Sequence, residues 1–342
     1  MNYFQKAFYL FILFFFSSTN ALAGGLEVSR QNNMILFTDG KKVDFLSRQT
    51  TSSVKDNVFS GGQTVIKKLN IMSAAYKADY NDSISYAFEM YEPMASTLQY
   101  PAAVAVKALL RTQALALTGK YKLANSPFGI VAGMRYLTIK RSTLNVGVAD
   151  MITTPESEYG YMMGASYEKP EIALKVLLAH SPAIDFTLPI TLANTATAAQ
   201  AEMTTLDFET GIAKDTLLYG SIHQSAWGSA QVKLAGTQIS TFSDSDKYNI
   251  GVGRKFSEKL SGSISYTTEA GSSATGTSLL SPTNGTDTYG IGVKYSDDFG
   301  DLTFGYALSS FGDKAVSSGG ATGNFNNNDA TTVGLKISFK MP

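Results

Sequence analysis

Large apolar residues occupy every second position in several stretches of the chain. In the stretch from 288 to 310, Tyr289, Ile291 and Val293 alternate with glycine and lysine, and after a polar break the pattern resumes from Leu302 to Leu308. A period of two indicates β-strands, and two such strands across a short polar turn predict a hairpin. The apolar face of this hairpin contacts either a protein core or lipid, and in lipid the small polar face lines the interior of a barrel.

The same alternation recurs along most of the chain and predicts about fourteen strands, with roughly twelve to sixteen as the range. Each run is about ten residues long, which is the length that a tilted strand needs to cross a bilayer. The predicted strands are residues 42–54, 69–80, 82–92, 109–123, 127–140, 157–169, 170–182, 203–213, 215–227, 246–256, 258–269, 286–296, 300–310 and 329–340.

The connections between these strands alternate between short and long. Single residues such as Asn81, Lys214 and Ser257 separate some pairs, whereas long segments such as 183–202 separate others. Outer-membrane barrels show this alternation, because their periplasmic turns are tight and their outer loops are long. The pattern therefore predicts an all-β fold, a transmembrane antiparallel barrel in the bacterial outer membrane with both termini periplasmic. The alternatives are a secreted β-sandwich or β-solenoid, although no repeat of 20–50 residues supports a solenoid.

The composition agrees with a barrel and narrows the function. Lysine plus arginine balance aspartate plus glutamate at 28 each, so there is no electrostatic case for binding nucleic acid. Charged residues make up only 16% of the chain, below the usual quarter, while glycine and tyrosine are abundant. The chain has no cysteine, which excludes disulfides, cysteine-ligated zinc and thiol catalysis.

The first residues have the pattern of a cleaved signal peptide. Lys6 precedes an apolar core from Ala7 to Phe16, and an Ala-Leu-Ala sequence ends at Ala23. A membrane anchor is the alternative, but this core is too short, because a spanning helix needs about 20 apolar residues. We therefore expect a signal peptide at 1–23, a short N-terminal segment at 24–40 and the barrel at 41–342.

The segment 24–40 is too short to be a domain, and its unpaired backbone cannot lie in lipid. We expect it to fold inside the barrel as a plug, or hatch. The alternative is a disordered leader, which the apolar run Met34–Phe37 disfavours because it would gain by burial. We expect apolar contacts with the lumen from Met34, Leu36 and Phe37, and hydrogen bonds to the wall from Gln31, Asn32 and Asn33.

The third predicted strand ends at an unusual place. Tyr91 is the last residue of its alternating run, and Glu92 and Pro93 follow. Proline cannot donate a hydrogen bond to a neighbouring strand, so it belongs at a strand end or a bulge. A local break in strand pairing is therefore predicted at Pro93.

Phrases along nearly the whole mature chain resemble the outer-membrane long-chain fatty acid transporter family (the FadL/TodX type). They include GLEVSRQNNMILFTDG, YEPMASTLQYP, LDFETGIAKDTLLYGSIHQSAW and a closing NNDATTVGLKISF. The resemblance implies a fourteen-stranded barrel with an N-terminal hatch, passive uptake of hydrophobic molecules, and a lateral opening near a distorted third strand. There are two departures: the Asn-Pro-Ala hatch motif of the family is missing, and three residues follow Phe339, where the family ends on an aromatic residue.

Charged residues on the strands are candidates for a site in the lumen. A hydrophobic acid needs an apolar wall for its tail and a cation for its carboxylate. Arg135 and Lys175 are our candidates for that cation, and ion pairs that hold the barrel and hatch together are the alternative. The residues assigned to the lumen face are Glu89, Arg135, Lys140, Glu168, Lys175, Lys294 and Lys336.

Loops 94–108 and 183–202 are the most apolar of the predicted outer loops. Exposed apolar loops are unfavourable unless they pack together or bind a ligand. They predict either a hydrophobic capture groove or a simple cover over the barrel mouth.

Nothing in the chain predicts an enzyme. The histidines, His180 and His223, lie near serines, but no G-x-S-x-G or H-E-x-x-H motif accompanies them. We expect no cofactor or metal, and a monomer whose partners are outer-membrane lipid and hydrophobic small molecules such as fatty acids or hydrocarbons. A general porin for polar solutes and a non-transport barrel, an adhesin or enzyme, are the alternatives.

Overall fold

The computed structural model describes residues 25–272, 275–298 and 300–341 of the chain. The predicted signal peptide at 1–23 lies outside these residues. Within the described ranges, no helix is both long enough and apolar enough to span a bilayer.

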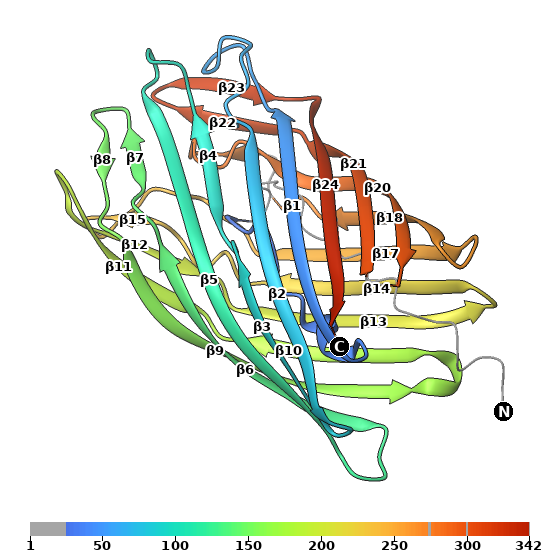
Figure 1. Cartoon of the computed structure of the whole chain (residues 1–342). Coiled ribbons are helices and arrows are strands. Elements are labelled where there is room, and N and C mark those ends of the chain that lie inside the picture. Colours follow the sequence, from blue (N-terminus) through green and yellow to red (C-terminus); the bar gives the residue numbers. More distant parts are fainter. Residues whose placement is uncertain (1–24, 273–274, 299, 342) are drawn as a thin grey trace.

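Fourteen antiparallel strands form a closed barrel, as the alternating pattern predicts (Figure 1). The barrel closes where β1 pairs with β24, over a ladder from Lys41↔Met341 to Ser53↔Asp329. In barrel order the strands are β1 (Lys41–Ser53), β2 (Leu69–Asn81), β3 (Ile84–Tyr91), β5 (Val106–Lys122), β6 (Phe128–Ile139), β9 (Glu156–Lys169), β10 (Leu174–Ser181), β13 (Met203–Ala213), β14 (Thr216–Ser225), β17 (Ser245–Lys255), β18 (Leu260–Glu269), β20 (Asn284–Asp297), β21 (Gly300–Gly312) and β24 (Asn328–Met341).

One boundary differs clearly from the prediction. The strand expected at 170–182 begins only at Leu174, because Pro170–Ile172 form a short 3-10 helix, η3. Pro170 supplies no backbone N–H to a ladder, and Ala173 adopts φ 51°, which turns the chain before β10 starts.

Ten shorter strands of the described chain lie in the long connections, at the end of the barrel opposite the tight turns (Figure 1). The alternating pattern did not predict them, because most are only two to five residues long. They are β4 (Ala95–Gln99), β7 (Thr143–Val146), β8 (Met151–Ile152), β11 (Ile184–Ile190), β12 (Asn194–Gln200), β15 (Lys233–Leu234), β16 (Thr237–Gln238), β19 (Thr275–Gly276), β22 (Lys314–Ser318) and β23 (Ala321–Phe325).

The barrel wall has an apolar outer face and a small or polar inner face. On β20, Tyr289 and Ile291 are 66% and 56% exposed, whereas their neighbours Thr288 and Gly290 are buried. No other part of the described chain covers these large apolar side chains. An apolar band of this kind around a closed barrel is the surface that contacts lipid. Large residues of other alternating runs also point outward: Tyr159, Tyr161 and Phe304 are exposed, and Tyr306 is half-buried.

Aromatic pairs border this apolar face at both ends. Toward the long loops, Tyr136 lies 5.0 Å from Tyr159, and a second ring pair is formed by Tyr266 and Tyr289. Toward the tight turns, Phe128 packs edge-on against Tyr167 at 5.2 Å. Two aromatic girdles with aliphatic residues between them are typical of membrane barrels, because the rings favour the two lipid–water interfaces.

The depth of a residue in the apolar face should therefore set the effect of a charge placed there. We expect Ile291→Lys, in the middle of β20, to lower the free energy of unfolding by about 2–4 kcal/mol, and Tyr295→Lys, near its end, by at most about 1 kcal/mol. Urea unfolding of the two variants in lipid vesicles measures both values. Equal effects at the two positions would contradict a lipid-covered face.

Candidate functional site

The described N-terminal residues, 25–40, run inside the barrel. Met34, Ile35, Leu36 and Phe37 belong to a short 3-10 helix, η2 (Asn33–Phe37), and each is at most 5% exposed. They pack against wall side chains of small or moderate size, which leave room for the helix. The wall residues of this cluster are Ala75, Ala87, Val131, Met162, Leu177 and Ala179.

Polar contacts hold the residues just before η2 to the wall. The Gln31 side-chain amide donates to Thr118 Oγ1 at 2.5 Å, and the Asn32 backbone N–H donates to Glu89 Oε2 at 2.9 Å. The side-chain oxygens of Asn32 and Asn33 are buried without a hydrogen-bond partner. The expected bond from Gln31 is therefore present, whereas Asn32 is held through its backbone.

Glu27 anchors the end of the segment nearest the long loops. Its carboxylate accepts a hydrogen bond from His223 Nε2 at 3.1 Å and lies 3.8 Å from Lys247 Nζ, which also approaches Glu269 at 3.6 Å. Burial alone would raise the pKa of Glu27, but the interaction with His223 and the charges of Lys247 and Arg30 outweigh it and lower the pKa to about 2. Glu27 is therefore a carboxylate in the folded protein at neutral pH.

Three lysines of the wall contact the end of the segment nearest the tight turns. Lys175 Nζ donates to the Phe37 carbonyl at 3.1 Å and pairs with Glu209 at 2.9 Å. Lys77 Nζ donates to the carbonyls of Thr38 and Gly40, and Lys120 lies 4.2 Å above the Phe37 ring. Lys175 and Lys77 thus satisfy backbone carbonyls of the segment, and Lys120 makes a cation–π contact with Phe37.

Most of the charges assigned to the lumen lie there, and several form ion pairs. Glu168 pairs with Lys120 at 2.7 Å, and Lys336 pairs with Asp44 at 2.8 Å. Lys140 is the exception, because its side chain is exposed on the outer face. Arg135 and Lys140 are five positions apart along β6 and its end, so an extended chain places them on opposite faces. Assigning both to the lumen was wrong.

Arg135 is a buried cation without a carboxylate. Its side chain is 4% exposed and contacts Tyr91, and its Nε has no hydrogen-bond partner. None of the ion pairs among the described residues includes it. The Arg135 Nε–H is therefore buried without an acceptor, whereas Lys175 is occupied by Glu209 and the Phe37 carbonyl.

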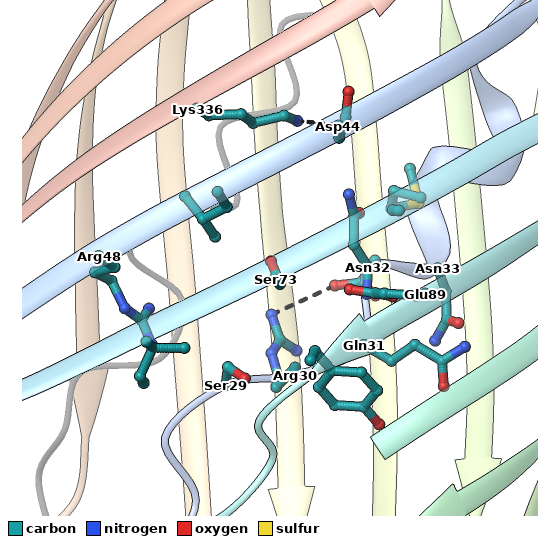
Figure 2. A pocket seen from close by; sticks show the side chains of 16 residues that line it. Ser29, Arg30, Gln31, Asn32, Asn33, Asp44, Arg48, Ser73, Glu89 and Lys336 are labelled. Atoms are coloured by element: carbon teal, nitrogen blue, oxygen red, sulfur yellow. Dashed lines mark hydrogen bonds and ion pairs between the residues drawn. The ribbon is translucent and has the colours of Figure 1, made fainter. Parts of the chain in front are cut away.

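The spaces around the hatch are small. A cavity of about 80 Å³ lies between the segment and the wall, lined by residues that include Arg30, Asp44, Arg48 and Glu89 (Figure 2). A second, of about 40 Å³, includes Arg135 in its lining. Pockets for small organic ligands occupy about 300–1,000 Å³, so neither space admits such a molecule while the segment is in place.

Larger pockets lie at the two ends of the lumen. The pocket among the long loops has about 360 Å³ and includes Val106, Leu279 and Leu280 in its lining. The pocket near the tight turns has about 290 Å³ and contains Asp79 and Lys120. Leu36, Phe37, Thr38 and Asp39 of the N-terminal segment line this second pocket.

The wall is broken where Pro93 predicts a break. Pairing of β2 with β3 ends at Ala74↔Met90, so the start of β2 has no partner on the β3 side of its ladder in the described structure. On the other side, β3 pairs with β5 up to Tyr91↔Ala114, and β4 resumes at Ala95↔Arg111. Three residues, 92–94, thus oppose two on β5, which is the arrangement of a β-bulge.

The hatch supplies the missing strand partner from inside. The Val28 N–H donates to the Pro93 carbonyl at 2.9 Å, and the Ala95 N–H donates to the Leu26 carbonyl at 3.1 Å. On the outside, Arg111 pairs with Glu92 at 2.6 Å and donates to the Asn70 carbonyl of β2 at 2.9 Å. The break is therefore covered by the hatch on one face and by Arg111 on the other.

The apolar outer loops pack against one another across the barrel mouth. Leu98 and Tyr100, from the predicted loop 94–108, and Phe186 and Leu188, from 183–202, are buried in one cluster that also contains Trp227. The Tyr100 hydroxyl donates to the Leu279 carbonyl at 2.9 Å. These loops form a cover, and the open space among them is the pocket of about 360 Å³.

Sequence reasoning missed several of these residues. Lys77 and Lys120 lie on strand positions whose alternation identifies them as inward-facing, so the pattern contained that signal. Glu27 and His223 are 196 positions apart, and no sequence pattern indicates that they meet.

Comparisons with known proteins agree with this architecture. The sequence matches no protein-family model and no curated protein. Among solved structures, a Pseudomonas aeruginosa FadL homologue is similar at a TM-score of 0.71 and 12% identity, covering 94% of this chain and 98% of that one. The Ralstonia pickettii toluene transporter TbuX is similar at a TM-score of 0.64 and 10% identity, covering 94% of this chain and 96% of that one. The Pseudomonas putida toluene transporter TodX is similar at a TM-score of 0.62 and 10% identity, covering 94% of this chain and 97% of that one. The chain thus has the FadL-type fold that the resemblance implied.

The Glu27 anchor should depend on pH in a defined direction. Because the pKa of Glu27 is lowered in the folded state, its contribution is complete above the ordinary value of 4.5 and is lost as the pH falls toward about 2. We expect hatch opening, measured as conductance of the purified barrel in planar bilayers, to increase across this window. Glu27→Gln should show raised conductance at every pH and lose the dependence. A variant with the same profile as the native protein would contradict the anchor.

Proposed function

We propose that this protein is an outer-membrane channel for the passive uptake of hydrophobic molecules, with both termini periplasmic. Two neighbouring features carry the proposal. The hatch, held by polar contacts, fills the lumen, and the wall is broken directly beside it. A polar-solute pore needs an open lumen, whereas a hydrophobic solute can leave sideways into lipid. The similar structures are a FadL homologue and toluene transporters, which supports this substrate class.

Within that class, we propose hydrophobic acids such as fatty acids as substrates. The buried Arg135 guanidinium offers charge-assisted hydrogen bonds to a carboxylate, and no carboxylate of the described chain pairs with it. Met34, Leu36 and Phe37 supply apolar surface for the tail on the hatch itself. In this proposal Lys175, our other candidate cation, positions the hatch rather than the ligand.

The proposed path begins in the pocket among the outer loops and ends at the wall break at Tyr91–Met94. Ligand entry displaces the hatch, because the lumen spaces of about 80 and 40 Å³ hold no such molecule otherwise. The Gln31 side chain and the Asn32 backbone N–H then exchange their wall contacts for water. Displacement also frees the Pro93 carbonyl, which opens the break from inside.

We do not propose an enzymatic activity. Both ring nitrogens of His223 are engaged, Nε2 by Glu27 and Nδ1 by Thr205 at 2.7 Å. A polar-solute porin stays an outcome of the experiment, because charged side chains line the cavity of about 80 Å³ beside the hatch.

Uptake into liposomes tests the function and the role of Arg135 together. The panel contains fatty acids of several lengths, neutral aromatic hydrocarbons and sugars. We expect uptake of fatty acids and of hydrocarbons. Arg135→Met should lower the uptake of fatty acids alone, by about ten- to a hundredfold, because a hydrogen bond to a charged group contributes that factor to binding. Arg254→Met, at an exposed position on the tight-turn side, is the control. Rapid sugar uptake without hydrocarbon uptake would overturn the proposal in favour of a porin.

Removing the hatch tests gating. Deletion of residues 27–38 should raise the conductance for small ions and leakage of polar solutes, because the segment fills the lumen. Heat-modifiable migration on gels checks that the barrel assembles. An assembled deletion variant with unchanged conductance would contradict the gating role.

A further inference from the structure

Three cations lie on the lipid-facing side of the wall, at the ends of strands nearest the long loops. Lys68 precedes β2 and shares its face with the exposed Met72, and Arg111 shares the face of Leu115 on β5. Lys140 follows β6 on the face of Tyr136 and is the residue misassigned to the lumen. Its backbone N–H donates to the Arg111 carbonyl at 2.9 Å, so the two cations are cross-strand neighbours.

Two neighbouring cations add to the positive charge of this group, and one acid offsets part of it. Lys67 and Arg141 are exposed beside Lys68 and Lys140, and Glu92 is the acid that pairs with Arg111. No hydrogen bond or ion pair of the described structure engages the side chains of Lys68, Lys140 or Arg141. Like charges on adjacent strands repel, so the arrangement favours an external anion. We name these five residues the rim patch: Lys67, Lys68, Arg111, Lys140 and Arg141.

Exposed acidic residues lie elsewhere on the same rim. Asp246, Asp287 and Asp329 are exposed on the outer face at the corresponding ends of β17, β20 and β24. The chain has no net charge, so the basic residues of the rim patch do not reflect a general excess of lysine. Basic and acidic residues instead occupy different parts of the outer rim. The rim patch is therefore a localised site.

We propose that the rim patch binds the phosphorylated headgroup of an outer-leaflet glycolipid. This inference rests on the outer-membrane orientation proposed above, which puts the patch at the level where lipid phosphates begin. Lysine ammonium groups and a planar guanidinium are the side chains that recognise phosphate. Arg111 already spans from Glu92 to the Asn70 carbonyl, so the bound lipid lies against the wall break between β2 and β3.

Lipid retention tests the proposal. The full barrel is reconstituted in phosphatidylcholine vesicles with or without diphosphorylated lipid A, re-extracted, and analysed for co-purifying lipid by native mass spectrometry. We expect retained lipid A in the native protein, and an affinity about 100-fold lower in Lys68→Gln/Lys140→Gln/Arg141→Gln. The matched control neutralises three exposed lysines near the tight turns, Lys169, Lys214 and Lys259, and should retain lipid A like the native protein.

Further arms separate charge from folding and from other ligands. The variant Lys68→Arg/Lys140→Arg/Arg141→Lys keeps the charge and should retain lipid A like the native protein. Dephosphorylated lipid A should bind far more weakly, and inorganic phosphate should not compete at equal phosphate concentration. Equal retention by the triple variant and its control, or displacement by inorganic phosphate, would overturn the proposal. Hydrophobic uptake is measured separately in lipid A-free vesicles, so failure of the channel function is distinguishable from failure of this site.

Discussion

Closure of the backbone hydrogen-bond ladder is the constraint on which the rest of this structure depends. In hydrocarbon no water can satisfy an unpaired N–H or C=O group, so a sheet that crosses a bilayer must close on itself. Here β1 and β24 pair along their whole lengths and complete the fourteen-stranded ring. Closure leaves a wide lumen, and the lumen must either hold water or be filled by the chain itself.

The N-terminal segment fills the lumen and supplies backbone partners where the ladder between β2 and β3 is incomplete. Between Tyr91 and Ala95 the wall loses its β2 partner, and Leu26 and Val28 take over the backbone hydrogen bonds from inside. The hatch and the wall break are therefore one structural unit, held by the same bonds. A force that removes the segment also leaves polar groups of the break unpaired, which couples opening of the lumen to loosening of the wall.

The lumen charges act mainly as anchors. Glu27, Lys77 and Lys175 bind the hatch or its neighbours through buried contacts, and such contacts are specific because an unpaired buried charge is unfavourable. Arg135 is the exception, since it is buried against Tyr91 without an acid. Buried contacts therefore hold the N-terminal segment to the wall, whereas the Arg135 Nε–H has no acceptor.

The sequence by itself determined the barrel, because residue alternation is local. Whether a side chain points to lipid or to the lumen depends only on its position along an extended strand, and short turns with long loops are equally visible in one dimension. The break at Pro93 was also predictable, since proline lacks a backbone donor. Assigning both Arg135 and Lys140 to the lumen broke that local rule, because residues five positions apart on an extended chain lie on opposite faces.

Only the tertiary structure decided which distant residues meet. Glu27 with His223, Lys175 with the Phe37 carbonyl, and the outer-loop cluster around Trp227 join segments far apart in sequence. Such contacts depend on the curvature of the closed wall and on the path of the hatch through it. The strand pattern fixes the face on which each side chain lies, but the space left inside the ring determines its partner.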